Sequence, residues 1–133
     1  MPQSFIFPPQ GFYTGVIYVL FEPIPKKWLI HTVVSAAVDT AAGAFGSREI
    51  IEGEIIRNVR IVGLKQSVNV TKDDTEYSVN TVLMHQPGIS TDFNYVEGEY
   101  ILFQGRLYQI ISVEEIYEAE RLHHLEVQLC GLQ

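Results

Sequence analysis

Apolar and polar residues alternate with the two-residue period of a β-strand in two neighbouring stretches of the chain, residues 66–72 and 77–84. In the first stretch the two valines fall on one face and polar residues fall on the other. Asp73 and Asp74 come between the stretches, and short polar side chains of this kind favour a turn because they bond the local backbone. The pattern predicts a β-hairpin.

Other stretches rich in β-branched and aromatic residues also have the length of strands and end at Gly, Pro or polar residues. We predict strands at 14–21, 28–34, 50–64, 99–103, 107–113 and 123–129. The long third stretch contains Gly53, where a bulge would bend it. Gln104 and Gly105 separate 99–103 from 107–113, and glycine accepts the positive φ of a tight hairpin turn. Gln is a poor first residue for such a turn, so a three- or four-residue loop is the alternative.

Two segments allow more than one structure. Residues 35–47 are rich in alanine and glycine, and they allow either a mobile loop or an Ala-rich helix, because Val34 and the apolar residues after it have helical spacing. Residues 114–122 allow either one helical turn or the tip of a long β-hairpin. We favour the hairpin tip.

These elements together predict an all-β fold with mainly antiparallel strands. We expect a small β-barrel or a sandwich with long loops and at most one short helix. Residues 14–133 are predicted to form a single β-barrel domain. Residues 1–13 contain three prolines and are predicted to form an extended arm, because proline resists both helices and central strands. The aromatic side chains of this arm, Phe5, Phe7 and Phe12, need a surface to pack on, either the domain itself or a neighbouring subunit.

The predicted hairpin over 99–113 is apolar on both faces. Tyr100 and Leu102 share one face of its first strand, whereas Ile101 and Phe103 share the other. A strand in a solvated antiparallel sheet usually has one polar face. We therefore expect this hairpin to lie at the centre of the fold or to pack its outer face on a second subunit.

The charge of the chain makes a conventional nucleic-acid-binding module an unfavourable interpretation. The formal net charge is −7, from 9 basic and 16 acidic residues, whereas affinity for nucleic acid comes largely from Lys and Arg. Lys26, Lys27 and Trp28 do place two cations beside an aromatic ring, an arrangement that can hold a nucleic acid strand. In so acidic a chain, we interpret this segment as a solvated turn.

Cysteine usage and hydropathy indicate the compartment. Cys130 is the single cysteine, so no intrachain disulfide can form. The N-terminus lacks the basic start and long apolar run of a signal peptide, and the apolar run at 16–21 is too short to cross a bilayer as a helix. We expect a protein of the cytoplasm, either of a cell or of an infected host, without a membrane partner.

Side chains that carry chemistry are present but do not form a known motif. The candidate metal ligands are His31, His85, His123, His124 and Cys130. His123 and His124 are adjacent, so we predict that they point to opposite faces of a strand and cannot bind one ion. The sequence has no Gly-x-Ser-x-Gly elbow, and carboxylate pairs such as Glu52 with Glu54 fall where solvated charge is expected. We predict no catalytic, cofactor-binding or metal-binding residues, and a structural or binding role in place of an enzyme.

One segment carries a family pattern. Residues 96–113 read VEGEYILFQGRLYQIISV, with Gly98 and Glu99 before an apolar strand, then Gly105, then Tyr-x-Ile-x-x-Val from Tyr108. This segment resembles the hairpin of tailed-phage head–tail joining proteins, also called stopper or head-closure proteins. In that pattern Asp is commoner than Glu after the first glycine, and a final apolar strand follows a variable tip, here at 122–129.

The resemblance implies a small β-barrel that assembles as a homo-oligomeric ring, a hexamer or dodecamer, between the portal-bound adaptor and the tail. Such a ring is a structural part of the virion, assembled in the host cytoplasm, and contacts the neighbouring connector and tail proteins. It has no catalytic residues and no cofactor. DNA passes through its channel without sequence-specific binding, and an acidic lumen would let DNA slide by repelling it.

The resemblance also gives expected contact residues and leaves two alternatives open. The expected interface residues are the hairpin aromatics Tyr100, Phe103 and Tyr108, in the core or at the subunit contact, and the arm aromatics Phe5, Phe7 and Phe12. A tail-terminator or another tail or neck ring protein is the first alternative, because it would share the β-domain and the ring. A small ligand-binding β-barrel is the second alternative and would be monomeric or dimeric.

Overall fold

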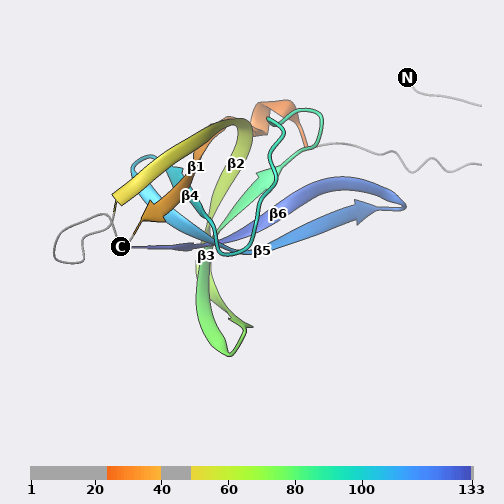
Figure 1. The fold of residues 1–133 in the computed structure, drawn as a ribbon. Coiled ribbons are helices and arrows are strands. Elements are labelled where there is room, and N and C mark those ends of the chain that lie inside the picture. Colours follow the sequence, from red (N-terminus) through yellow and green to blue (C-terminus); the bar gives the residue numbers. More distant parts are fainter. Residues whose placement is uncertain (1–23, 40–48, 133) are drawn as a thin grey trace, which may run out of the picture.

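The computed structural model describes residues 24–39 and 49–132, which form a closed antiparallel β-barrel (Figure 1). The strands are β1 (His31–Asp39), β2 (Glu49–Lys72), β3 (Thr75–His85), β4 (Tyr100–Phe103), β5 (Arg106–Glu118) and β6 (Arg121–Gly131), and the 3-10 turn η1 (Lys26–Trp28) precedes them. Around the barrel the order is β1-β2-β3-β6-β5-β4, and β4 pairs with β1 to close it. The predicted all-β antiparallel class is confirmed, and of the two predicted architectures the chain adopts the barrel.

Local turn chemistry forms the β2–β3 and β4–β5 hairpins. Asp73 and Asp74 have φ angles of 51° and 62°, and Gln104 and Gly105 have φ angles of 51° and 77°. Two successive residues with positive φ form the two-residue turn whose twist matches that of the strands it joins. The predicted hairpin over 66–84 is therefore confirmed, and the β4–β5 turn has two residues in place of the longer alternative.

Strands β5 and β6 form a long hairpin whose tip projects away from the barrel (Figure 1). Strand pairing continues as far as Glu118 and Arg121, and Ala119 in the turn has a φ of 57°. Residues 114–122 are therefore a hairpin tip, as predicted, and the alternative of a helical turn is wrong.

Strand β1 extends further than predicted. Ser35 and Ala36 pair with residues of β4, and the residues after them pair with β2. The alternative of an Ala-rich helix is therefore wrong for residues 35–39. Sheet partners satisfy the backbone groups of these residues, and this outweighs the helix preference of alanine.

Several other predicted boundaries differ from the structure. The strand predicted at 28–34 begins at His31, because the residues just before it form η1. The runs predicted as separate strands at 50–64 and 66–72 are one continuous strand, β2. The arm at 1–13, the strand at 14–21 and residues 40–47 lie outside the described residues.

Strand β2 has two bulges where it pairs with β1. At the first, Gly53 and Glu54 together oppose Ser35 of β1. The Glu54 amide donates a 2.8 Å hydrogen bond to the Ser35 hydroxyl, and a Cβ on residue 53 would lie 2.5 Å from that hydroxyl oxygen. This close approach requires glycine, and the bend predicted at Gly53 is a bulge. At the second bulge, Arg57 and Asn58 of β2 together oppose the single residue Thr32 of β1, because His31 pairs with Val59 and Val33 pairs with Ile56. Asn58 has a φ of 60°.

Alternate residues of the strands fill the barrel interior. The most completely buried side chains are Val33, Ile56, Val59, Val79, Leu83, Ile101, Ile110, Val127 and Leu129. Each such side chain stabilises the fold by about 1.5–3 kcal/mol when it leaves water. Successive side chains of a strand point to opposite faces, so the neighbours of these core residues lie on the outer surface of the barrel unless a bulge intervenes.

Candidate functional site

Four apolar side chains form a row across the outer surface of the barrel. Val34 of β1 pairs with Ile55 of β2 on one side and with Leu102 of β4 on the other, and Leu102 pairs with Leu107 of β5. Each of the four directly adjoins a buried residue of its own strand, so all four point away from the interior. Ile55 is 50% exposed and the other three are half-buried. These four residues are the outer row.

The outer row explains the two apolar faces that the sequence shows in the 99–113 hairpin. Ile101 and Tyr108 face the core, whereas Leu102 and Leu107 pair on the opposite face. A solvated face of an antiparallel sheet is usually polar, and contiguous apolar surface marks contact sites. The outer row is therefore a candidate surface for association.

A groove of about 1020 Å³ lies where the end of β1 and the start of β2 meet the loop 86–99. Its described lining includes the apolar residues Ala37, Ile51, Phe93, Tyr100 and Leu125 and the acidic residues Glu52, Glu54, Asp92 and Glu99. None of the described lining residues is Lys or Arg. The groove therefore combines apolar contact area with a negative potential, which suits a partner that is both apolar and cationic.

The second bulge of β2 holds one wall of this groove in place. The Thr91 amide donates a 3.1 Å hydrogen bond to the Arg57 carbonyl, and the Arg57 amide donates a 3.0 Å bond to the Thr91 hydroxyl. The Asn58 side-chain amide donates to the Ile89 carbonyl at 3.3 Å. The bulge leaves backbone groups of Arg57 without a partner in the neighbouring strand, and the loop 86–99 forms hydrogen bonds with these groups.

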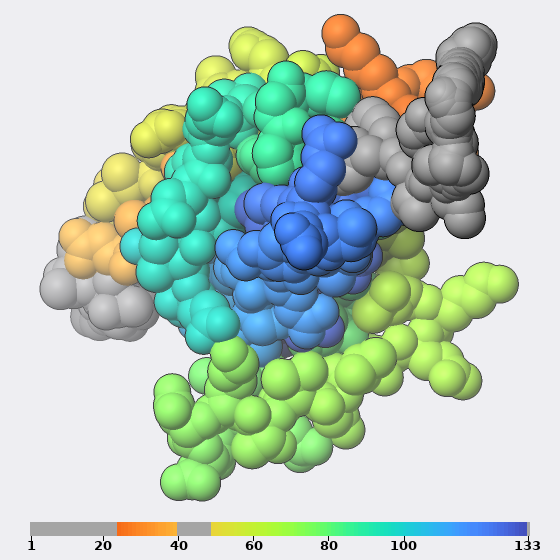
Figure 2. Space-filling model, turned by 90° about the vertical axis from the view of Figure 1, so that its right-hand side faces the viewer, coloured from red at the N-terminus to blue at the C-terminus, as the bar shows by residue number. Residues whose placement is uncertain are grey.

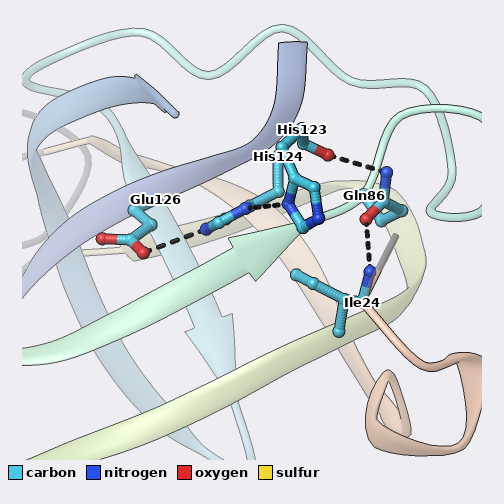
Figure 3. Close-up of polar contacts among 5 residues, drawn as sticks. All are labelled: Ile24, Gln86, His123, His124 and Glu126. Carbon is cyan, nitrogen blue, oxygen red and sulfur yellow. Dashed lines mark hydrogen bonds and ion pairs between the residues drawn. The ribbon is translucent and has the colours of Figure 1, made fainter. Parts of the chain in front are cut away.

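Gln86 ties the start of the loop to two other parts of the chain (Figure 3). Its side-chain oxygen accepts a 3.0 Å hydrogen bond from the Ile24 amide, and its side-chain nitrogen donates a 2.8 Å bond to the His123 carbonyl. Its own amide donates to the Ser90 hydroxyl at 2.9 Å. Gln86 is buried, so removal of its side chain would leave buried backbone groups without partners.

His123 and His124 lie side by side, which corrects the prediction that they point to opposite faces. The β5–β6 register shifts between the pairs Ile116↔His124 and Tyr117↔Leu122, so His123 is an extra residue in a bulge. The two Nδ1 atoms are 2.7 Å apart, and Nε2 of His124 is 3.0 Å from Glu126 (Figure 3). One Nδ1 must carry the shared hydrogen and the other must accept it, so the two rings and Glu126 form one chain of hydrogen bonds.

In the described part of the chain, no group of three or more His, Cys, Asp or Glu side chains is arranged to hold a metal ion. The His123–His124–Glu126 chain joins neighbouring positions of β6 by hydrogen bonds. Together with the Gln86 bond to the His123 carbonyl, it connects this strand to the base of the loop 86–99.

His85 and Tyr95 connect the groove to the barrel core. The His85 Nδ1 is 2.8 Å from the Tyr95 hydroxyl, both residues are buried, and His85 lines the groove. Burial lowers the pKa of His85, with Asp92 acting in the opposite direction, and burial raises the pKa of Tyr95 well above its usual range. Both side chains therefore favour their neutral forms, as a structural hydrogen bond under the groove requires.

The tip of the β5–β6 hairpin is acidic. Figure 2 shows this tip (blue) between the loop 86–99 (teal) and the β2–β3 hairpin (green). It carries the carboxylates of Glu114, Glu115, Glu118 and Glu120. Tyr117 is 55% exposed and donates a 3.0 Å hydrogen bond to Glu115, and this bond raises the pKa of Tyr117. The tip is therefore a surface that repels polyanions.

The structure separates the aromatic residues that the sequence suggests for the interface. Tyr108 belongs to the core, and Phe103 packs against the core with its ring edge-on to His31 at 5.1 Å. Tyr100 lies on the other face of β4 and lines the groove. Phe5, Phe7 and Phe12 lie outside the described residues.

Sequence reasoning found the apolar outer face of the 99–113 hairpin, but it missed the continuation of this face onto Val34 and Ile55, and it missed the groove. The adjacent apolar pairs Ile50–Ile51 and Ile55–Ile56 were the available signal, because each places apolar side chains on both faces of β2. The groove has no comparable signal, since its walls come from segments far apart in the chain.

The family model of the minor capsid proteins matches residues 25–129. The chain belongs to the minor capsid protein family. No curated protein matches the chain significantly. The match begins just before η1 and ends at Leu129 within β6, so it covers nearly all of the described barrel.

Membership of the minor capsid protein family makes the chain a structural protein of the phage virion. The predictions of a phage structural protein and of the virion as its location are confirmed at this level. The family implies a structural role, not an enzymatic one, and association with other virion proteins. Among the described residues, no helix has the length and apolarity needed to span a membrane.

Proposed function

We propose that this minor capsid protein is a subunit of the ring that joins the head of a phage to its tail. It occupies the stopper position, between the portal-bound adaptor and the tail. The observation that carries the proposal is the outer row on a closed barrel, together with the resemblance of residues 96–113 to head–tail joining proteins.

Closure of the barrel determines how subunits can associate. An open sheet can add a strand from a neighbour along its edge, but β4 pairs with β1 and closes the barrel wall, so unpaired edges are left on the projecting β2–β3 and β5–β6 hairpins. Association through the barrel wall therefore uses side chains on its outer surface. The outer row supplies apolar area for this contact, and repetition around an axis gives a closed ring, a hexamer or a dodecamer.

The N-terminal arm adds to this contact in the proposal. The arm at 1–13 precedes the barrel domain at 14–133, and its aromatic residues Phe5, Phe7 and Phe12 tie it to a neighbouring subunit. On the barrel side, Tyr100 is the hairpin aromatic that lies at the surface, while Phe103 and Tyr108 support the hairpin from inside.

The acidic charge fits a channel for DNA. The chain has a net charge of −7, and the β5–β6 tip concentrates carboxylates at one projecting end. Such a surface lets DNA move past because it offers few cations for the phosphates to bind. DNA passes the ring without sequence-specific contacts.

A tail-terminator ring is the second candidate, since it would use the same barrel and the same outer row. The ligand-binding barrel is less well supported, because the barrel interior is filled by close-packed apolar side chains and the groove is open to the surface.

Particles assembled without this protein test the position. If it is the stopper, heads package DNA but lose it, and complete tails accumulate unattached. Tails of abnormal length beside stable, filled heads would contradict the stopper position and support the tail terminator. Antibody labelling of wild-type particles should mark the neck, and labelling of the head surface would contradict both positions.

A further inference from the structure

The segment 26–30 presents cationic and apolar side chains on a fixed turn. Lys26 and Lys27 are exposed, Trp28 is 50% exposed and Ile30 is 67% exposed. Exposed apolar patches rimmed by polar residues mark interaction sites, and Trp is enriched among the residues that contribute most to binding. The segment therefore has the chemistry of a contact site.

The turn is held in shape before any partner binds. Leu29 is buried, with 2% of its surface exposed, and so is Ile24 just before the turn. The Trp28 amide donates a 2.8 Å hydrogen bond to the Pro25 carbonyl, and Arg60 donates a 3.2 Å bond to the Trp28 carbonyl. These contacts fix the backbone, so docking orders little more than a few side chains. Arg60 also adds a third cation beside the two lysines.

We propose that segment 26–30 of one copy docks into the groove of the next copy in the ring. The inference rests on the proposed ring and identifies the two surfaces that meet. Lys26, Lys27 and Arg60 face the carboxylates of the groove, and Trp28 packs on its apolar wall. Like signs repel within each surface, and opposite signs attract between them.

The dimensions of the two surfaces agree. A buried aromatic side chain covers about 150–250 Å². A groove of about 1020 Å³ has room for the Trp28 ring together with the stems of the lysines. Stable interfaces bury about 800 Å² on each partner, more than this segment supplies alone, so the outer row contributes the remaining area.

The positions of the two surfaces favour a head-to-tail contact. Segment 26–30 directly precedes β1, and the groove is lined by the end of β1, so the two lie at opposite ends of one strand (Figure 1). Each copy therefore offers a turn at one end and a groove at the other. Contacts between two different surfaces of this kind form a closed ring when the rotation from one copy to the next closes on itself.

Charge reversal on each surface, measured by analytical ultracentrifugation of the full chain, tests the contact. The turn variant is Lys26→Glu/Lys27→Glu, and the groove variant is Glu52→Lys/Glu54→Lys. Each should weaken self-association at least about tenfold, because like charges then meet. The matched controls, Lys65→Glu/Arg106→Glu and Glu76→Lys/Glu120→Lys, change the same charge at exposed positions elsewhere and should assemble as the wild type does.

Recombination of the variants gives the decisive result. A mixture of the turn variant with the groove variant should regain assembly, and so should one chain that carries all four changes. Circular dichroism on each variant confirms folding. Assembly that withstands both reversals, or a mixture that fails to recover while the folded single variants are impaired, would overturn the contact.

Two other outcomes distinguish a failure of this contact from a failure of the proposed ring. A wild-type chain that never assembles contradicts the ring itself, and the contact with it. A wild-type ring that withstands the reversals but is lost on deletion of residues 1–13 keeps the ring and assigns the assembly contact to the arm, which overturns the inference.

Discussion

The two faces of the sheet formed by β1, β4 and β5 are both apolar, but they serve different purposes. On the inner face, Val33 and Ile101 are completely buried in the core. On the outer face, Val34 and Leu102 pair with each other in the outer row and remain partly exposed. The inner residues stabilise one chain, whereas in the proposed ring the outer residues contribute when a second chain covers them.

This difference shows why hydrophobicity alone does not identify the core of a small barrel. Each face of β4 carries one aromatic and one aliphatic residue, Phe103 with Ile101 on the inside and Tyr100 with Leu102 on the outside. Closure of the sheet decides which face is inside, and substitutions on the two faces should have different effects on folding and on assembly.

The largest effect on stability is expected from the inner face. Ile101→Ala should lower the free energy of unfolding by about 2–5 kcal/mol, because it removes a fully buried side chain and leaves a cavity. The matched substitution on the outer face, Leu102→Ala, should cost about 1 kcal/mol or less. Urea unfolding of the dilute chain gives both values. Equal losses would remove the distinction between the faces.

The largest effect on assembly is expected from the outer face. Leu102→Glu places a charge in the outer row and should weaken self-association at least about tenfold, since the carboxylate would be buried without a partner. Ser67→Glu adds the same charge at an exposed position and serves as the control. Light scattering over a concentration series measures the association. A Leu102→Glu ring as stable as the wild type would exclude the outer row from the contact.

A smaller effect on stability is expected at the first bulge of β2, at Gly53 and Glu54. This bulge determines to which side of the sheet the residues of β2 before it point. Gly53→Ala should destabilise the chain by about 1–3 kcal/mol, because the new Cβ would collide with the Ser35 hydroxyl. Gly53→Ala/Ser35→Ala removes the oxygen and should recover part of the loss. A double variant no more stable than the sum of the single changes predicts would show that the hydroxyl is not the obstacle.

The smallest effect is expected from the titration of His85. Its pKa is lowered in the folded chain by burial, with Asp92 opposing, from an ordinary value of 6.5. The unfolded chain therefore binds more protons, and the stability from neutral His85 is present above about pH 6.5 and lost as the pH falls toward the folded pKa. His31 contributes in the same direction.

His85→Gln should therefore flatten the dependence of unfolding free energy on pH between about pH 7 and 5. Tyr95→Phe removes the hydrogen bond but keeps the titrating ring, so it controls for lost contacts. If His85→Gln leaves the slope as steep as in the wild type, another group carries the pH dependence.

The sequence predicted the hairpins well because their turns are determined locally. Asp73–Asp74 and Gln104–Gly105 adopt positive φ between alternating runs, and this chemistry is visible in a few adjacent residues. Pairing between strands that are far apart in the sequence was less predictable. The end of β1 has an alanine-rich sequence that suits a helix, and it is a strand because β2 and β4 lie on either side of it.

The candidate site was less predictable than the fold. His123 and His124 meet because of a bulge that depends on the register with β5. The groove brings Glu52 and Glu54 of β2 toward Asp92 of a distant loop, and no local pattern signals that approach. The segment Lys26–Trp28 was visible in the sequence as a cationic, aromatic turn and was interpreted as a solvated turn, and the docking role proposed for it depends on the groove.

The absolute mass of the full chain in solution, measured by native mass spectrometry and light scattering over a concentration series, tests the central claim most directly. A ring subunit predicts one discrete closed species, a hexamer or a dodecamer, with no open series of larger assemblies. A strict monomer at every concentration would contradict the claim that the outer surface of this barrel is built for contact with copies of itself.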